Sequence, residues 1–301
     1  MKTAWMKQLV SAAFAAQLLF AGPAFAQDAA KPDAQQNEME VAVTAVRKAL
    51  QPGPVEIPLT DQAKLKLPAG YAFVPKAEAA RWMHAMGNHT DARFIGVIVG
   101  DKIEGFVTVD FEKSGYIKDE DAKTWNADDL LQNIREGTTE GNKDRAARGL
   151  PEMDIIGWVE KPGYDAGTHR LIWSISSRTK GAPADSEQGI NYNTYVLGRE
   201  GYLTLNLVTG LKEIEAQKPQ ARELLAAVNF NEGKRYEDFN ADTDKVAEYG
   251  LAALVGGLAA KKLGLLAVVG AFLLKAWKLV LIGVVALGAG AKKFFGKNDE
   301  A

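Results

Sequence analysis

The sequence predicts an α+β domain with a mostly antiparallel sheet flanked by helices, followed by a C-terminal transmembrane helix or helices. Two observations predict the domain. Short runs of alternating apolar residues are separated by tight turns, and segments with helical spacing lie between these runs. A third observation predicts the membrane segment, because apolar blocks bounded by lysines dominate the chain from residue 249 to the end.

Residues 1–26 have the order of a secretory signal peptide. Lys2 and Lys7 precede an apolar run over residues 9–20, and Ala24-Phe25-Ala26 forms a small-x-small cleavage site. This run is short for a membrane span of about 20 residues, so we expect cleavage after Ala26 rather than a retained helix. Export would place the following residues outside the cytoplasm.

Residues 27–54 are expected to form a linker and an N-terminal helix. The polar composition of residues 27–37 indicates a loose linker. Apolar side chains at every fourth position from Val41 to Ala49 predict a helix over Glu38–Leu50. The sequence Gln51-Pro52-Gly53-Pro54 would end it.

Residues 55–248 are expected to form the α+β domain. Its first half begins with extended pieces and a helix over Lys76–Gly87, followed by a β-hairpin formed by Phe94–Val99 and Glu104–Phe111. A helix is expected to begin after Asn126 and to run to about Arg148. The side chain of Asn126 can cap it, and the acidic residues of its first turn interact favourably with the helix dipole.

The second half of the domain is expected to supply the rest of the sheet. A tight turn at residues 198–201 joins the last two of its strands, and an amphipathic helix over Lys212–Val228 follows them. In the second strand, Leu171, Trp173 and Ile175 share one face. The four expected strands are Asp154–Glu160, His169–Ser177, Tyr192–Leu197 and Tyr202–Val208.

Residues 249–301 are expected to form a membrane anchor with a basic tail. Apolar blocks over residues 249–260, 263–274 and 279–291 are separated by lysines, and each block alone is too short to cross about 30 Å of hydrocarbon. Joined as one helix, residues 263–291 would be ~43 Å long and would carry Lys275 and Lys278 on one face near its middle.

The number of membrane crossings stays open between one and two, and an interfacial hairpin also fits the pattern. We prefer one crossing, because an exported domain would then leave the basic tail on the cytoplasmic side. The intramembrane pair Lys275 and Lys278 would need a partner, so we expect a contact with another inner-membrane protein as well as with the lipid bilayer.

Charge and composition exclude several function classes. The formal net charge is −2, the signal peptide holds two lysines, and the last 53 residues hold seven lysines against two acids. The exported domain therefore carries about −9, which opposes nucleic-acid binding. The chain has no cysteine, which excludes a lipoprotein anchor, disulfides and cysteine chemistry.

The strongest candidate for catalytic chemistry is the segment "GYDAGTHRLIWS", which contains Tyr164, Asp165 and His169. Asp and His form the acid–base pair of many hydrolases, so this segment predicts a polar pocket at the sheet edge. The alternative is structural. Asp165 lies in a Pro-Gly-Tyr-Asp-Ala-Gly turn, and His169 would share a strand face with Trp173.

We expect no metal and no cofactor. The acidic segment "KDEDAKTWNADD" places Lys123 where an EF-hand loop needs an oxygen ligand, so helix capping and solvation explain it better than Ca²⁺. His84 and His89 lack the glutamate and the spacing of an HExxH site. No nucleophile-elbow, P-loop or dinucleotide motif occurs.

Several long segments carry a family resemblance: "GYIKDEDAKTWNADDLLQNIREGTTEGNKDR", "GWVEKPGYDAGTHRLIWS", "INYNTYVLGREGYLTLNLV" and "TDKVAEYGLAALVGG". From about Val55 to the tail, the chain resembles bacterial membrane-anchored proteins grouped as a domain of unknown function, the DUF family numbered 2167. The resemblance implies an exported domain, a C-terminal anchor and no established activity, and it supplies no catalytic residues. The layout is also weakly similar to PsbP-like and Mog1-like domains, which are mostly binding and assembly factors.

Two functions fit these expectations. The first is a periplasm-facing binding or assembly module, held at the bacterial inner membrane by its C-terminal segment. The second is a membrane-tethered hydrolase that uses Asp165 and His169. A concave pocket around these two side chains would favour the enzyme, and a flat surface there would favour the binding module.

Overall fold

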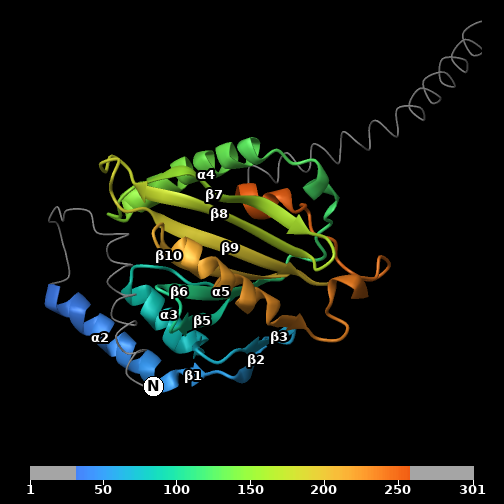
Figure 1. Cartoon of the computed structure of the whole chain (residues 1–301), viewed down its shortest axis with the longest axis horizontal. Coiled ribbons are helices and arrows are strands. Elements are labelled where there is room, and N and C mark those ends of the chain that lie inside the picture. The colour runs from blue at the N-terminus through green and yellow to red at the C-terminus, as the bar shows by residue number, and fades with distance from the viewer. Residues whose placement is uncertain (1–31, 258–301) are drawn as a thin grey trace, which may run out of the picture.

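The computed structural model describes residues 32–257 and confirms an α+β fold with a large antiparallel sheet (Figure 1). The predicted signal peptide, Lys275, Lys278 and the anchor beyond Gly257 lie outside the described residues. Between residues 32 and 257, no helix combines the length and the apolar character that a membrane crossing requires.

The main sheet has eight strands, and each neighbouring pair is antiparallel. In spatial order they are β1 (Gln51–Pro52), β4 (Tyr71–Pro75), β5 (Phe94–Gly100), β6 (Phe106–Glu112), β10 (Tyr202–Gly210), β9 (Gly189–Leu197), β8 (Arg170–Thr179) and β7 (Met153–Asp165). A separate three-stranded sheet has the order β11 (Val228–Phe230), β3 (Ala63–Leu67) and β2 (Val55–Leu59).

The sheet is flanked by the helices α2 (Pro32–Ala49), α3 (Lys76–Ala85), α4 (Ala127–Ala147) and α5 (Ile214–Ala226), and residues 252–257 are also helical. The 3₁₀ turn η1 (Glu120–Lys123) precedes α4, and the 3₁₀ turn η2 (Tyr236–Asp238) follows α5 and β11. The predicted cap of α4 is confirmed, because Oδ1 of Asn126 accepts the backbone N–H of Asp128 at 2.8 Å.

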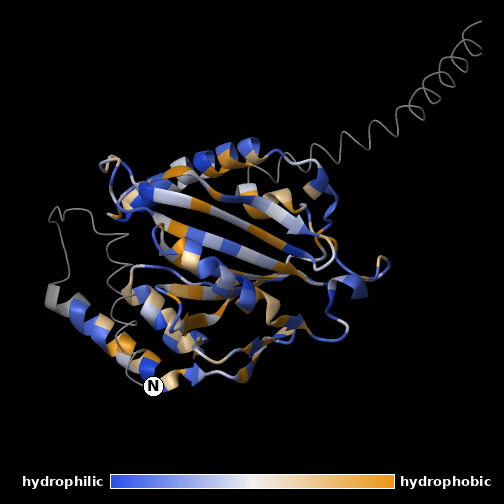
Figure 2. Cartoon of the chain, in the orientation of Figure 1, coloured by the Kyte–Doolittle hydropathy of each residue, from blue (hydrophilic) through white to orange (hydrophobic). Residues whose placement is uncertain are grey.

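One face of the central strands is covered without interruption. Helix α5 and the three-stranded sheet pack on it and form the largest apolar core (Figure 1). The strands contribute every second residue to this core, for example Val107, Val109 and Phe111 of β6 and Leu203, Leu205 and Leu207 of β10. Figure 2 shows the resulting alternation of hydropathy along the strands.

Of residues 32–257, helices and loops cover the opposite face only at its two ends. Helices α2 and α3 pack over β4, β5 and the start of β6, around the fully buried Trp82. Helix α4 packs along β7, and residues 251–255 pack with it over β8 and β9. The middle of this face, on β6, β10 and β9, lies between the two covers.

The N-terminal helix departs from the sequence-based expectation. Residues 32–37 begin α2, whereas the sequence predicted a linker there. The reason is local, since proline is favoured at the first position of a helix, where its missing N–H has no intrahelical partner.

The C-terminal boundary of the domain also lies later than the predicted residue 248. Leu251 and Val255 are buried, and the carboxylate of Asp121 accepts the backbone N–H groups of Leu251 and Ala252 at 3.1 and 3.0 Å. The hydroxyl of Tyr195 donates to the carbonyl of Leu254 at 3.1 Å. The first apolar block of the predicted anchor therefore begins inside the folded domain.

Candidate functional site

The structure brings two of the three predicted site residues together. The hydroxyl of Tyr164 lies 3.1 Å from Nδ1 of His169 and donates to Oδ2 of Asp119 at 2.8 Å. The phenol proton is used by Asp119, so Nδ1 of His169 is the donor to the phenol oxygen. The imidazole stacks on Tyr236 with ring centroids 4.0 Å apart.

His169 lies in the turn between β7 and β8, not on a strand face with Trp173 as expected. Its φ of 52° is left-handed, and strand β8 begins one residue later at Arg170. A left-handed residue cannot continue the alternation of a strand, which explains the difference.

Asp165 is engaged by the turn rather than by His169. Its Oδ1 accepts the N–H of Gly167 at 2.9 Å, and its Oδ2 accepts the hydroxyl of Thr168 at 2.7 Å. The hydrogen bond from Thr168 lowers the pKa of this exposed carboxyl, so it stays ionised. These contacts give Asp165 the turn-stabilising role that aspartate has in many loops.

The Tyr164 cluster has the chemistry of a packed network. Burial and the hydrogen bond to Asp119 raise the pKa of Tyr164, so its phenol stays protonated and does not act as a base at neutral pH. The stacked Tyr236 covers the ring of His169 and donates its own hydroxyl to the carbonyl of Ile117 at 2.8 Å. Between residues 32 and 257, no group of three His, Asp or Glu side chains could hold a metal ion.

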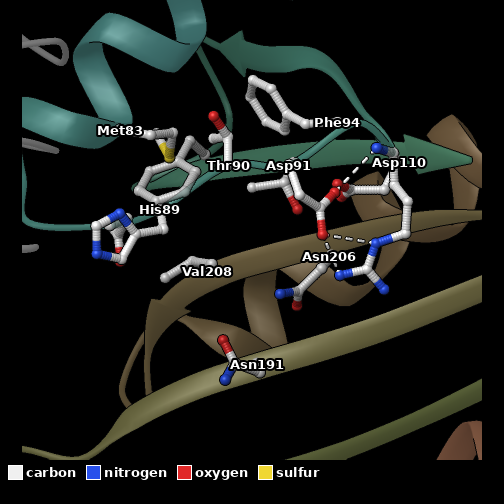
Figure 3. Close-up of a pocket in the computed structure, with 13 residues that line it drawn as sticks. Met83, His89, Thr90, Asp91, Phe94, Asp110, Asn191, Asn206 and Val208 are labelled. Carbon is white, nitrogen blue, oxygen red and sulfur yellow. Dashed lines mark hydrogen bonds and ion pairs between the residues drawn. The ribbon is translucent and has the colours of Figure 1, made fainter. Parts of the chain in front are cut away.

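A cavity of about 430 Å³ lies on the half-covered face of the sheet, between the two helical covers (Figure 3). Its floor is formed by β6, β10 and β9, through residues that include Thr108, Asp110, Asn206 and Asn191. Helix α3 and the connection from α3 to β5 close one side. Figure 3 shows Met83, His89 and Phe94 on that side, across from Asn206 and Asn191.

Asp110 is the carboxyl of this cavity whose pKa is raised. Burial raises the pKa of its carboxyl to about 6, although a hydrogen bond from Thr108 and the charges of Arg93 and Lys76 oppose the shift. In the strand register, Asp110 lies opposite Phe94 of β5, so an aromatic neighbour replaces water beside it. The described residues supply no ion-pair partner to Asp110.

The nearest cation is already used by other carboxylates. Arg93 binds Asp91 through its Nε at 2.8 Å and through a second, shorter contact from Nη2. Its Nη1 reaches Glu112 at 3.2 Å. The hydrogen bond from Arg93 lowers the pKa of Asp91. The lining around Asp110 therefore keeps a net negative charge.

A second polar group lacks a partner. Oδ1 of Asn206 is shielded from solvent and accepts no hydrogen bond from any described residue. Asn206 lies on β10 beside Thr108 of β6 and Asn193 of β9, in a polar row across three strands. Buried acceptors without a partner are rare in proteins and usually call for an explanation.

Sequence reasoning did not find this cavity, although the sequence contains a signal for it. In "TVDF", "NYN" and "TLNL", polar residues occupy the positions that alternate with the apolar core residues. Such alternation on a strand indicates one solvated face. Only the pairing of β6 with β10 shows that these faces adjoin, and only the fold shows that helices flank them.

The comparisons with known proteins give a family and a weak structural likeness. The model of the family described as "Protein of unknown function (DUF2167)" matches residues 51–288. No curated protein matches the chain. The solution structure of cyanobacterial PsbP (CyanoP) from Synechocystis sp. PCC 6803 is similar at a TM-score of 0.36 and 12% identity, over 61% of this chain and 93% of that chain.

Proposed function

The chain belongs to the DUF2167 family of proteins of unknown function, and we propose that it is an exported, membrane-anchored binding module. Its ligand site is the cavity on β6, β10 and β9, and its position is the periplasmic side of a bacterial inner membrane. No catalytic role is assigned to Asp165, because its two oxygens stabilise the turn.

The observation that carries the proposal is the incomplete solvation of the cavity floor. A polar sheet face that served solubility alone would be open to water, and its groups would be hydrated. Here the pKa of Asp110 is raised to about 6 by burial, and Oδ1 of Asn206 has no described partner. Cavities with a few convergent polar groups and a perturbed carboxyl are typical of binding sites.

The binding proposal is tested by extracting small molecules from the full-length chain, purified in a mild nonionic detergent, and identifying them by mass spectrometry. Asn206→Trp fills the cavity from its floor. Asn229→Trp makes the same change at an exposed position of β11 and serves as the matched control. A molecule recovered from the wild type and the control but not from the filled variant supports the site, and equal recovery from all three contradicts it.

The location is supported by the signal peptide and by the lysine-bounded apolar blocks. The folded domain extends at least to Val255, and the first lysine pair of the anchor follows at Lys261. The domain would therefore lie directly against the bilayer surface.

Protease added to spheroplasts should digest the domain, and protease added to intact cells should not. A domain protected in spheroplasts would contradict the location.

The predicted partner contact is tested in the membrane segment. We propose that Lys275 and Lys278 pair with another inner-membrane protein, because lysines at that depth require a polar partner. Affinity purification of the full chain should recover a stoichiometric membrane protein, and Lys275→Leu with Lys278→Leu should lose it while the chain stays in the membrane. Purification of the chain alone would reduce the segment to a tether.

A further inference from the structure

The chemical class of the ligand follows from which polar groups of the cavity already have partners. The guanidinium of Arg93 is held by Asp91 and Glu112, so the nearest positive charge is neutralised. Asp110 and Oδ1 of Asn206 remain as acceptors without a matching donor in the described residues, apart from the hydrogen bond from Thr108 to Asp110. An occupant that completes the site must bring hydrogen-bond donors and positive charge.

Part of the cavity lining is apolar, beside the polar residues Asn88, His89 and Thr90. This apolar part consists of Met83 of α3 and Phe94 of β5 on one side, and of Phe106 of β6 and Val208 of β10 on the floor. Strand register places Val208 opposite Phe106, two positions along from Asn206 and Thr108. The apolar part and the polar part therefore lie next to each other on one floor, and aromatic rings near a carboxylate also favour a cationic group.

We infer that the cavity binds a small organic cation: a protonated amine on an aromatic or alkyl body, with the ammonium at Asp110 and Asn206 and the body against Phe94, Phe106 and Met83. This inference rests on the proposed binding function and names its ligand class. An anion would meet the carboxylates of Asp91 and Asp110. A fully hydrophilic ligand would leave the apolar part of the lining without a contact.

Binding of a cation at this site has a predictable pH dependence. An ammonium binds the ionised form of Asp110, and an alkylamine stays protonated across the physiological range. Arg93, Asp91 and Lys76 also act on Asp110, and His89 lines the cavity from the α3–β5 connection. With a pKa of about 6, affinity should be about tenfold lower at pH 5 than on its plateau above pH 7.

The experiment compares three probes of similar shape and different charge on the full-length chain in nonionic detergent, by isothermal calorimetry. Phenethylamine is cationic, phenethyl alcohol is neutral and hydrocinnamate is anionic. We expect phenethylamine to bind roughly tenfold or more tightly than the other two, and its affinity to fall below pH 6.

Three variants test whether phenethylamine binds in the cavity. Asp110→Asn should lose roughly tenfold or more of the phenethylamine affinity and should remove the pH dependence, with little change for phenethyl alcohol. Asp165→Asn removes an exposed carboxylate elsewhere and should bind as the wild type does. His89→Gln should keep the pH dependence, because Asp110 is still present. This control is needed because an imidazole can also change its charge near neutral pH.

The outcomes separate the ligand class from the binding function. If phenethyl alcohol or hydrocinnamate bound more tightly than phenethylamine, and Asn206→Trp lost this binding, the cavity would still be a binding site. The inference that its ligand is a cation would then be overturned. Phenethylamine binding that is as tight in Asp110→Asn and in Asn206→Trp as in the wild type would place it outside the cavity and overturn the inference. Absence of binding by all three probes, with nothing extracted from the purified chain, would overturn both.

Discussion

The two faces of β6, β10 and β9 differ although the same three strands form both. On one face, alternate residues such as Leu203, Leu205 and Leu207 are at most 2% exposed beneath α5 and the small sheet. On the other face, Thr108, Asp110 and Asn206 line a cavity. A shift of one residue along a strand thus separates the largest apolar core from the lining of the cavity.

The residues that stabilise the domain and the residues that line the candidate site therefore lie on opposite faces of the same strands. The filled face, with Leu203, Leu205 and Leu207, contributes apolar burial at roughly 25 cal/mol per Å². The open face holds a carboxylate whose pKa is raised by burial, so its ionised form disfavours the folded state at neutral pH. Groups that lower stability in this way are concentrated at functional sites.

The largest expected effect comes from the filled face. Leu205→Ala removes a side chain that is 2% exposed and should lower the free energy of unfolding by about 2–5 kcal/mol, through lost burial and a residual void. Chemical unfolding of the full chain in nonionic detergent measures it. Thr204→Ala, the next residue on the opposite face, should cost far less. Equal costs would mean that the two faces do not differ in packing.

The second-largest expected effect is an increase in the free energy of unfolding, and it comes from the open face that Thr108, Asp110 and Asn206 form. Asp110→Asn should raise the free energy of unfolding at pH 7 by up to about 3 kcal/mol, because the carboxyl has a pKa of 3.8 when unfolded and about 6 when folded. Between these values the folded protein binds the extra proton, so stability falls as pH rises from 3.8 to 6.

The pH dependence of the Asp110→Asn effect provides the control. Below pH 3.8 the carboxyl is protonated in both states, and the difference between variant and wild type should vanish. Thermal midpoints measured at acid and neutral pH test this. A variant that is less stable than the wild type at pH 7 would show that Asp110 is compensated in the folded state, and the distinction between the two faces would then fail.

The third prediction compares the cavity with the Tyr164–His169 network near the turn from β7 to β8. His169→Ala removes the stacking on Tyr236 and the hydrogen bond to Tyr164, and it should lower the free energy of unfolding by about 1–2 kcal/mol. Phenethylamine binding should be unchanged at temperatures where the variant is folded. Loss of ligand binding with an unchanged thermal midpoint would instead restore a functional role for His169.

The sequence allows prediction of features that depend on neighbouring residues. The β5–β6 and β9–β10 hairpins follow from turn residues between alternating strands, and Asn126 caps α4 through contacts within three residues. The start of α2 was missed because the polar composition of residues 27–37 outweighed the signal of Pro32.

Features that depend on distant residues could not be predicted. Asp119 replaces Asp165 as the carboxylate of the Tyr164 network, and the two are 46 positions apart in the sequence. Asp110 faces a cavity because α3 and the connection from α3 to β5 close one side above its face of the sheet. The alternation in β6 shows that Asp110 and Val109 point to opposite sides, but it does not show which elements lie there.

The smallest expected effect tests the unpartnered acceptor on the open face. Asn206→Leu removes a buried oxygen that lacks a hydrogen bond and adds an apolar contact, so the free energy of unfolding should rise by about 1 kcal/mol. Phenethylamine affinity should fall, because the ammonium loses one acceptor. Asn229→Leu, on the exposed side of β11, should change neither quantity. A variant that loses stability and keeps its affinity would mean that Asn206 supports the fold, and that the open face is built for packing as the filled face is.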